Sequence, residues 1–386
     1  MATVGNTTSC RFLRQLAAML VVTVSLGAQQ PVLPLMPMPA VEPGVPAFLL
    51  QPPAATLWTV PIPAAPMHPP LIRGSRIFVT TLPGLLAAHD LRDGHELWRV
   101  TLTASQQVAA DDERVYVAAG EELHALDAAT GAVAWRIPTG TLTAPPVAEG
   151  GWVIVSPARR TTALRAADGT VVWSRENALQ RDRATLAGDV VILPLRTGVV
   201  QALEITTGAT RWERAVGGFP AESLVVGERV YVGATNKVFY CLKLASGAIE
   251  WPIRVGAEIR GTAAGDDDRV YFAALDNVVR AVDRISGTQR WQMGLPFRPL
   301  SGPRVVGGSV FLAGPSADIH LLDPVAGGQA GKMSFPDPLA ISPGIGDFEG
   351  AVVAAGITGG LNESWKLILV SHRSNLPSFA GPSISR

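Results

Sequence analysis

Short segments in which apolar and polar residues alternate recur along most of the chain. In the clearest unit, residues 114–117 are β-branched and aromatic and residues 123–127 alternate, and both patterns are typical of half-buried β-strands. Gly131 marks a tight turn, where glycine tolerates a positive φ, and residues 132–137 predict a third strand. An inner strand such as residues 145–148 opens the next unit. The pattern therefore predicts units of four short antiparallel strands.

This unit repeats with a period of 37 to 40 residues. Each copy has a tryptophan, a glycine four positions earlier and a small residue ten positions earlier. The tryptophans are Trp98, Trp135, Trp173, Trp212, Trp251 and Trp291. A four-stranded repeat of about 40 residues is typical of a β-propeller blade. We infer that each indole packs between neighbouring blades, over the small residue and the turn glycine. Cys241 occupies the small position of one unit, so we expect a buried, unreactive thiol.

Two further units are incomplete. The seventh has Gly331 in the tryptophan position, and the eighth begins near Ala351 and ends before its last strand. Trp58 lies 40 residues before Trp98, where an outer strand belongs, so residues 56–60 are expected to pair with the carboxy-terminal strands and close the ring. The fold predicted is all-β, an eight-bladed β-propeller of four-stranded antiparallel blades closed by an N-terminal strand. Seven blades is the alternative if the last unit is irregular.

The two ends of the chain have different compositions. Residues 1–28 combine arginines, an apolar core and small residues at the expected cleavage site, which is typical of a secretory signal peptide. The apolar core is shorter than the ~20 residues that a membrane span needs, although an uncleaved anchor is the alternative. We interpret residues 29–51 as a proline-rich linker, residues 52–370 as the propeller and residues 371–386 as a flexible tail. The protein is therefore expected to be periplasmic or otherwise exported, with no stable transmembrane segment after signal removal.

Charge and motifs argue against several classes of function. Lysine plus arginine and aspartate plus glutamate both number 32, so no net charge attracts the protein to nucleic acid. The chain contains no Gly-x-Ser-x-Gly elbow, no phosphate-binding loop and no His-Glu-x-x-His motif. The six histidines are scattered, and the acidic run 266–268 lacks the alternate spacing of a calcium loop. We therefore expect no catalytic residues and no metal site.

Arginines are concentrated in the connections of the third and fourth blades. They are Arg159, Arg160, Arg175, Arg181, Arg183 and Arg196. In a propeller, loops between second and third strands share a face with the loops that join blades, so these side chains are expected to converge on one sector. Convergent guanidiniums favour an acidic or hydrogen-bonding partner. Ordinary solvated loops, partly paired with Glu176 and Asp182, are the alternative.

The phrase at residues 125–135 resembles the tryptophan-docking repeat of pyrroloquinoline-quinone (PQQ) type propellers, and the resemblance covers about residues 54–370. Two branches of that family are relevant. The quinoprotein dehydrogenases imply a bound quinone, calcium and an adjacent cysteine pair, but this chain has only Cys10 and Cys241. The BamB-like outer-membrane assembly propellers resemble the chain in size, export signal and blade number.

The BamB-like branch implies a non-enzymatic, monomeric scaffold without a cofactor that binds a protein partner in the cell envelope. Its members contact the barrel-insertion subunit through a loop after the third blade that carries leucine and arginine. The matching loop is 177–183, which gives Leu179 and Arg181 as expected contact residues. No lipid-attachment cysteine follows the signal, which departs from that branch. The alternatives are a periplasmic PQQ-dependent oxidoreductase with calcium and a polysaccharide-binding propeller.

Overall fold

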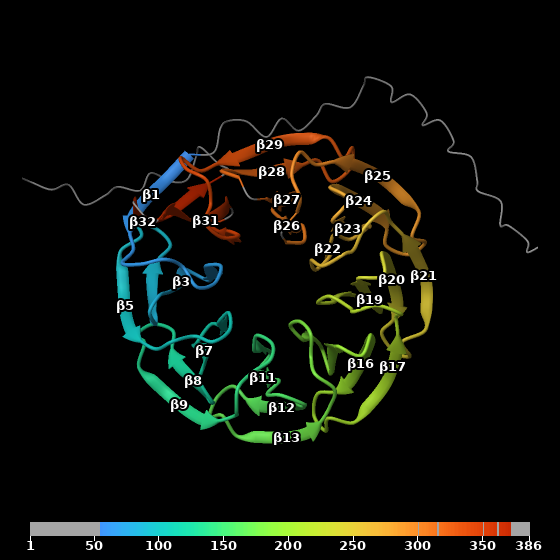
Figure 1. The fold of residues 1–386 in the computed structure, drawn as a ribbon, viewed down its shortest axis with the longest axis horizontal. Coiled ribbons are helices and arrows are strands. Elements are labelled where there is room, and N and C mark those ends of the chain that lie inside the picture. Colours follow the sequence, from blue (N-terminus) through green and yellow to red (C-terminus); the bar gives the residue numbers. More distant parts are fainter. Residues whose placement is uncertain (1–54, 300, 315, 350, 361–362, 372–386) are drawn as a thin grey trace, which may run out of the picture. The chain divides into compact units, whose positions relative to one another are not determined.

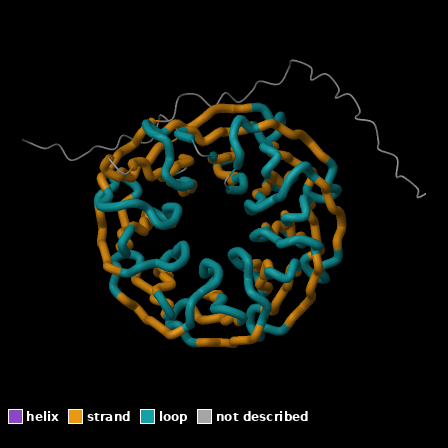
Figure 2. The backbone as a smooth tube through the Cα atoms, viewed as in Figure 1, coloured by secondary structure: helices purple, strands orange, loops and turns teal. Residues whose placement is uncertain are grey.

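A computed structural model describes residues 55–371 except 300, 315, 350, 361 and 362. Its strands form eight four-stranded antiparallel sheets arranged as the blades of a ring (Figures 1 and 2). The eight-bladed prediction is therefore confirmed, and the seven-bladed alternative is wrong. Within the described ranges, no helix has the length and apolar character needed to cross a membrane. The predicted signal peptide and linker, and the tail beyond Ser371, lie outside the described residues.

Blades 1 to 4 follow one another along the chain, each running from its innermost to its outermost strand (Figure 1). Blade 1 is β2 (Leu71–Arg73), β3 (Arg76–Thr81), β4 (Leu85–Asp90) and β5 (Glu96–Thr101). Blade 2 is β6 (Ala109–Ala110), β7 (Arg114–Ala119), β8 (Glu122–Asp127) and β9 (Val133–Pro138). Blade 3 is β10 (Val147–Glu149), β11 (Trp152–Val155), β12 (Arg160–Arg165) and β13 (Val171–Glu176). Blade 4 is β14 (Thr185–Ala187), β15 (Val190–Pro194), β16 (Val199–Glu204) and β17 (Thr210–Ala215).

Blades 5 to 7 repeat this order, and blade 8 takes one strand from the other end of the chain. Blade 5 is β18 (Leu224–Val226), β19 (Arg229–Gly233), β20 (Val238–Lys243) and β21 (Ile249–Arg254). Blade 6 is β22 (Ala264–Gly265), β23 (Arg269–Ala274), β24 (Val278–Asp283) and β25 (Gln289–Gly294). Blade 7 is β26 (Arg304–Val306), β27 (Ser309–Ala313), β28 (Asp318–Leu322) and β29 (Gln329–Ser334). Blade 8 is β30 (Gly344–Phe348), β31 (Ala351–Gly360), β32 (Glu363–Ser371) and β1 (Ala55–Pro61).

The core lies between the faces of neighbouring blades rather than at one centre. The second and third strands of each blade are almost wholly buried, as in β7, where Val115, Tyr116 and Val117 have no exposed surface. The outer strands instead alternate between exposed and partly buried residues, as in β13. A strand packed on both faces needs apolar residues at consecutive positions, which explains why the second strands are continuous apolar runs.

Seven indoles join successive blades. Each Nε1–H donates to a backbone carbonyl in the next blade at 2.6–3.0 Å, and each ring covers the turn glycine of that next blade. The seven residues are Trp58, Trp98, Trp135, Trp173, Trp212, Trp251 and Trp291. A Cβ added to any of these glycines would lie 2.4–2.7 Å from an indole atom. Each of these indoles thus packs against the next blade, and the glycine that it covers belongs to the following repeat rather than to its own. The small residue faces the indole across strands of its own blade, as Ala163 faces Trp173.

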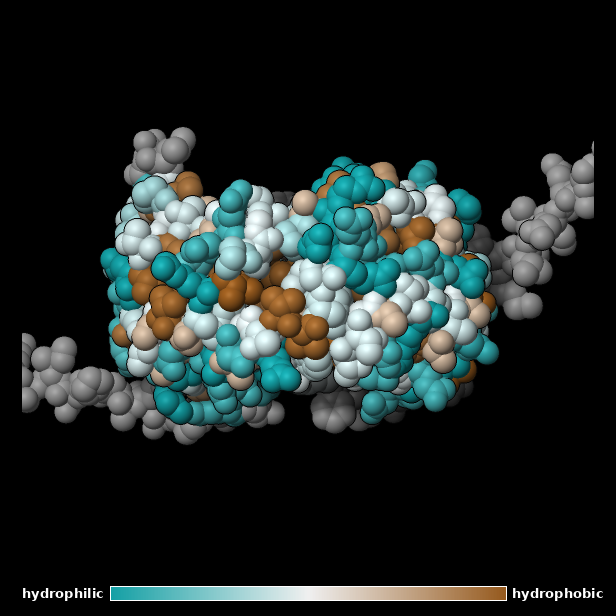
Figure 3. Space-filling model, turned by 90° about the horizontal axis from the view of Figure 1, so that it is seen from below, coloured by the Kyte–Doolittle hydropathy of each residue, from teal (hydrophilic) through white to brown (hydrophobic). Residues whose placement is uncertain are grey.

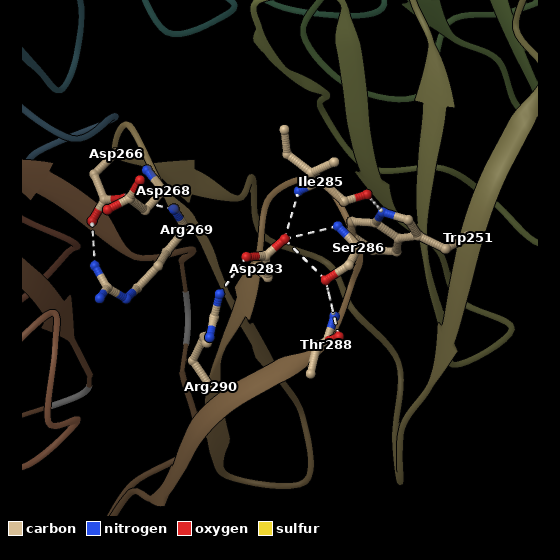
Figure 4. A network of polar contacts seen from close by, with 9 residues as sticks. All are labelled: Trp251, Asp266, Asp268, Arg269, Asp283, Ile285, Ser286, Thr288 and Arg290. Atoms are coloured by element: carbon tan, nitrogen blue, oxygen red, sulfur yellow. Dashed lines mark hydrogen bonds and ion pairs between the residues drawn. The ribbon is translucent and has the colours of Figure 1, made fainter.

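An aspartate holds four of these seven turns in shape, as the turn that receives Trp251 shows (Figure 4). One carboxylate oxygen of Asp283 accepts hydrogen bonds from the backbone N–H groups of Ile285 and Ser286, at 3.0 and 2.8 Å. The other oxygen accepts a hydrogen bond from the Arg290 guanidinium at 2.5 Å. The bond from the Ser286 N–H and the Arg290 contact lower the pKa of Asp283 well below its usual value. The Ile285 carbonyl, which accepts from Trp251, is therefore rigidly placed.

The ring closes as the sequence predicts. The strand β1 pairs antiparallel with β32, with Trp58 opposite Leu369 and Val60 opposite Leu367. The Trp58 indole then donates to the carbonyl of Leu91 in blade 1 at 3.0 Å. The joint between blades 7 and 8 differs because Gly331 stands where the other blades have tryptophan, paired with Leu321.

That joint is filled by other apolar side chains. Met333 and Phe335 are buried against Ala354 and Ile368 of blade 8. A Cβ added to Gly356 would lie 2.5 Å from the Phe335 ring, so glycine is needed there for close approach. Aromatic and methionine packing therefore replaces the missing indole.

Candidate protein-docking face

The connection from blade 3 to blade 4, residues 177–184, is fixed along its length by backbone hydrogen bonds. Gln180 forms an isolated β-bridge with Leu195, in the turn between β15 and β16. The N–H of Arg181 donates to the carbonyl of Pro194, and the N–H of Arg196 donates to the carbonyl of Leu179, both at 2.8 Å. This loop is therefore part of the blade 4 framework.

Gln180 anchors the loop through its side chain. It is only 2 % exposed; its Oε1 accepts from the Ser156 hydroxyl of blade 3, and its Nε2 donates to the carbonyl of Asp182 at 2.6 Å. Successive side chains of an extended segment point in opposite directions. Leu179 and Arg181 are accordingly directed away from Gln180, and both are partly exposed. The loop thus presents an apolar and a cationic side chain from a rigid backbone.

Phe219 extends this surface and was not predicted from the sequence. It lies in the connection from blade 4 to blade 5 and is 50 % exposed, and the Arg181 guanidinium lies 5.4 Å from its ring centroid. Thr235 holds the Phe219 backbone, accepting from its N–H at 3.0 Å and donating to its carbonyl at 3.1 Å. In the sequence, the only indication of this role is that Phe219 is a single aromatic residue in a glycine-rich connection. Leu179, Arg181 and Phe219 are called the docking triplet below.

Arg159 and Arg160 lie on the same face, at the turn between β11 and β12. They line an open pocket of about 660 Å³ together with the start of the connection that follows β13. The carbonyl of Arg159 accepts a hydrogen bond from the N–H of Asn177 at 2.8 Å, which joins this turn to the connection of residues 177–184. Arg196 is exposed on the β15–β16 turn. These arginines share the face of the docking triplet, as their place in the repeat predicts.

Arg175 and Arg183 do not join this group. Arg175 belongs to β13 rather than to a connection, and it donates to the Gly208 carbonyl of blade 4 at 2.6 Å. Arg183 donates to Gln107 Oε1, in the connection between blades 1 and 2, at 2.9 Å. Connections two blades apart can meet only near the ring axis. The prediction that all six arginines converge on one sector of one face is therefore wrong for these two.

Arg183 belongs to a polar network near the axis. The Thr262 hydroxyl donates to Glu222 Oε2 at 2.9 Å, and the N–H of Glu222 donates to Asp182 Oδ2 at 3.4 Å. Burial raises the pKa of Glu222, whereas the nearby Arg183 guanidinium favours the ionised form. This network connects interblade loops of several blades. Because its opposite charges face one another, it offers little free charge to a partner.

Apolar side chains also interrupt the hydrophilic rim, which Figure 3 shows from the side of blades 2 to 4. The most exposed ones on the outer strands there are Val133 and Val171, at 57 % and 51 %. Scattered apolar side chains of this kind are common on soluble surfaces. We assign no partner to them.

In the ranges given above, no group of three His, Cys, Asp or Glu side chains is placed to hold a metal ion. Cys241 is buried in β20, and burial and the Glu250 carboxylate raise its pKa to about 12. It therefore has the inert character expected of a residue in the small position of the repeat.

Known proteins share both the sequence pattern and the fold. The family described as outer membrane protein assembly factor BamB matches residues 82–227 and 217–376. The factor of that name from Moranella endobia is 25 % identical over 309 residues, covering 71 % of this chain and 79 % of its own. BamB from Moraxella catarrhalis has a similar structure, with a TM-score of 0.67, 18 % identity and coverage of 84 % of this chain and 98 % of its own.

The fold is also shared with an enzyme. Quinohemoprotein alcohol dehydrogenase from Comamonas testosteroni has a TM-score of 0.64 at 13 % identity, over 84 % of this chain and 78 % of its own. At that identity the likeness concerns the fold alone. The family match spans most of the propeller, in two segments that overlap at residues 217–227, from the connection after blade 4 to the first strand of blade 5. The chain belongs to the family of outer membrane protein assembly factor BamB.

Proposed function

We propose that this protein is an exported, non-enzymatic scaffold that binds a protein partner during outer-membrane protein assembly. The partner would be the barrel-insertion subunit of the assembly machinery, docked on the connections of blades 3 and 4. One observation supports this most directly: the loop after blade 3 presents Leu179 and Arg181 side by side on a backbone held by Gln180. A preorganised loop loses little conformational entropy on binding.

The docking triplet has the composition of an interface hot spot. Aromatic and arginine side chains dominate binding energy in protein interfaces, especially when an apolar neighbour excludes water. Phe219 provides a half-exposed ring, and Arg181 is already stacked over it. The guanidinium can still form hydrogen bonds in its own plane to a partner carboxylate or carbonyl.

Site-specific crosslinking in the native envelope tests this proposal. A photoreactive amino acid at position 179 should form an adduct with the barrel-insertion subunit, identified by mass spectrometry. The matched control places the same group at Val325, which is 66 % exposed in the turn between β28 and β29 of blade 7. This turn lies at the opposite end of the strands, so it should give no such adduct.

With the photoreactive group kept at position 179, Arg181→Glu should abolish the adduct. The double variant Leu179→Asp with Arg181→Glu should lower the amount of barrel proteins in the outer membrane. Arg165→Glu reverses an exposed charge at the opposite end of β12 and should change neither. Equal crosslinking from positions 179 and 325, or full function of the double variant, would contradict the proposal. Saturable binding of a polysaccharide, or dye reduction after addition of quinone and Ca²⁺, would support the alternative functions instead.

A further inference from the structure

The pocket beside the docking triplet has a lining suited to a particular chemical group. It lies between the connection from blade 2 to blade 3, the β11–β12 turn and the end of β13. Its volume of about 660 Å³ is in the range of ligand-binding clefts. The polar side chains of the lining are Thr139, Thr141, Arg159, Arg160, Glu176 and Asn177.

The two guanidiniums in this pocket are weakly engaged. Arg160 Nη1 donates to the Ser174 hydroxyl at 3.3 Å, and the Arg159 side chain is exposed. Among the residues that the structure describes, neither arginine forms an ion pair, although Glu176 lies opposite Arg160 in the strand register. Two arginines against one carboxylate leave an excess of one positive charge in the lining. Most of their hydrogen-bond donors are therefore available to an added acceptor.

The backbone around these arginines is held in one conformation. The N–H of Arg160 donates to the carbonyl of Pro157 at 3.0 Å, which closes the β11–β12 turn, and Asn177 donates to the carbonyl of Arg159. Ala158 has a φ of +45°, a left-handed conformation that is unfavourable for alanine. The turn is maintained despite that cost, and it places two consecutive arginines at the rim of the pocket.

We propose that this pocket binds a carboxylate side chain from an acidic, extended segment of a protein partner. Arginine binds carboxylates through paired N–H donors, and the Asn177 amide and the threonine hydroxyls offer further polar contacts. Glu176 would repel a phosphate dianion more strongly than a single carboxylate, and it can accept from a peptide N–H. The inference rests on the proposed function, because it assigns this partner segment to the face that carries the docking triplet.

Binding of fluorescein-labelled hexaglutamate to the full-length protein, followed by fluorescence anisotropy at low salt, tests the inference. Arg159→Glu combined with Arg160→Glu should weaken binding by about tenfold or more, because two exposed ion pairs are lost and like charges replace them. Arg165→Glu is the matched control, since Arg160 and Arg165 are the two exposed ends of the same strand β12. It should leave the affinity within about twofold, and thermal melts should show that both variants are folded.

The outcomes separate this inference from the proposed function. Leu179→Asp should abolish co-purification of the barrel-insertion subunit while leaving hexaglutamate binding intact. Hexaglutamate binding that is equally weakened by Arg165→Glu, or that is unchanged in the Arg159/Arg160 double variant, would overturn the pocket assignment. Inorganic phosphate that competes as effectively as free glutamate would overturn the preference for a carboxylate.

Discussion

Replacing Gly208 by alanine tests the packing of an indole against the next blade. Gly208 has a φ of +72°, and an added Cβ would lie 2.7 Å from the ring of Trp173. The matched control is Gly188→Ala in the same blade, where φ is +57° and no atom lies within 4 Å of the added Cβ. Both substitutions impose a left-handed backbone on alanine, but only the first displaces the indole.

The two variants should differ by the cost of displacing the ring. The left-handed conformation costs roughly 1 kcal/mol in each variant. In Gly208→Ala, overpacking adds about 1–3 kcal/mol, since either the ring or the turn must move. Movement also weakens the hydrogen bond from Trp173 Nε1 to the Ile205 carbonyl, which is 2.6 Å long and worth about 1 kcal/mol. We expect unfolding free energies lowered by about 1 kcal/mol for Gly188→Ala and by about 3 kcal/mol for Gly208→Ala.

Urea denaturation followed by far-ultraviolet circular dichroism measures both, because that signal reports mainly the backbone and does not require Trp173 as a fluorophore. Trp173→Ala alone should cost about 3–5 kcal/mol. In the Trp173→Ala background, Gly208→Ala should cost only about 1 kcal/mol, so the two changes should be strongly non-additive. Equal costs for Gly208→Ala and Gly188→Ala, or additive costs in the double variant, would refute the stacking argument.

Three other outcomes are expected. Deleting residues 55–61 should lower the unfolding free energy by about 4 kcal/mol or more, because it removes Trp58 as well as a strand; an unchanged melting curve would exclude ring closure by β1. Cys241 has its pKa raised to about 12 by burial, so it should react with Ellman's reagent at pH 8 only after unfolding. The pKa of Asp283 is lowered on folding, so its stabilisation is present above about pH 4 and is lost as the pH falls below that value. Asp283→Asn should therefore cost about 1 kcal/mol at pH 7 and progressively less in acid, which urea titrations from pH 3 to 7 can measure.

The fold could be predicted from the sequence because its main contacts use side chains with a regular spacing. An indole needs a glycine on one side and a small residue opposite, and these requirements recur in the six repeats that carry Trp98 to Trp291. Closure was predictable for the same reason. Trp58 lies one repeat length before Trp98, but the other strands of its blade do not precede it in the sequence. The packing of Phe335 in place of an indole was not predictable, because it depends on a non-repeated contact with Gly356.

The docking face was predictable only in part. Arg181 and Arg183 are two residues apart in one loop, and sequence spacing assigns them to the same surface. Their environments differ because Arg183 reaches Gln107, which is far away in the sequence, while Arg181 lies over Phe219. Contacts between distant connections decide which cation is free, and a single sequence carries no record of them.

The first described strand, β1, can take its place only after the last strand, β32, has formed. During synthesis or transport every blade but the eighth can be completed in chain order. Until β32 has formed, β1 has no strand partner, and its unpaired backbone donors and acceptors can pair with a neighbouring copy. The interval before ring closure is therefore when association between copies is most favoured.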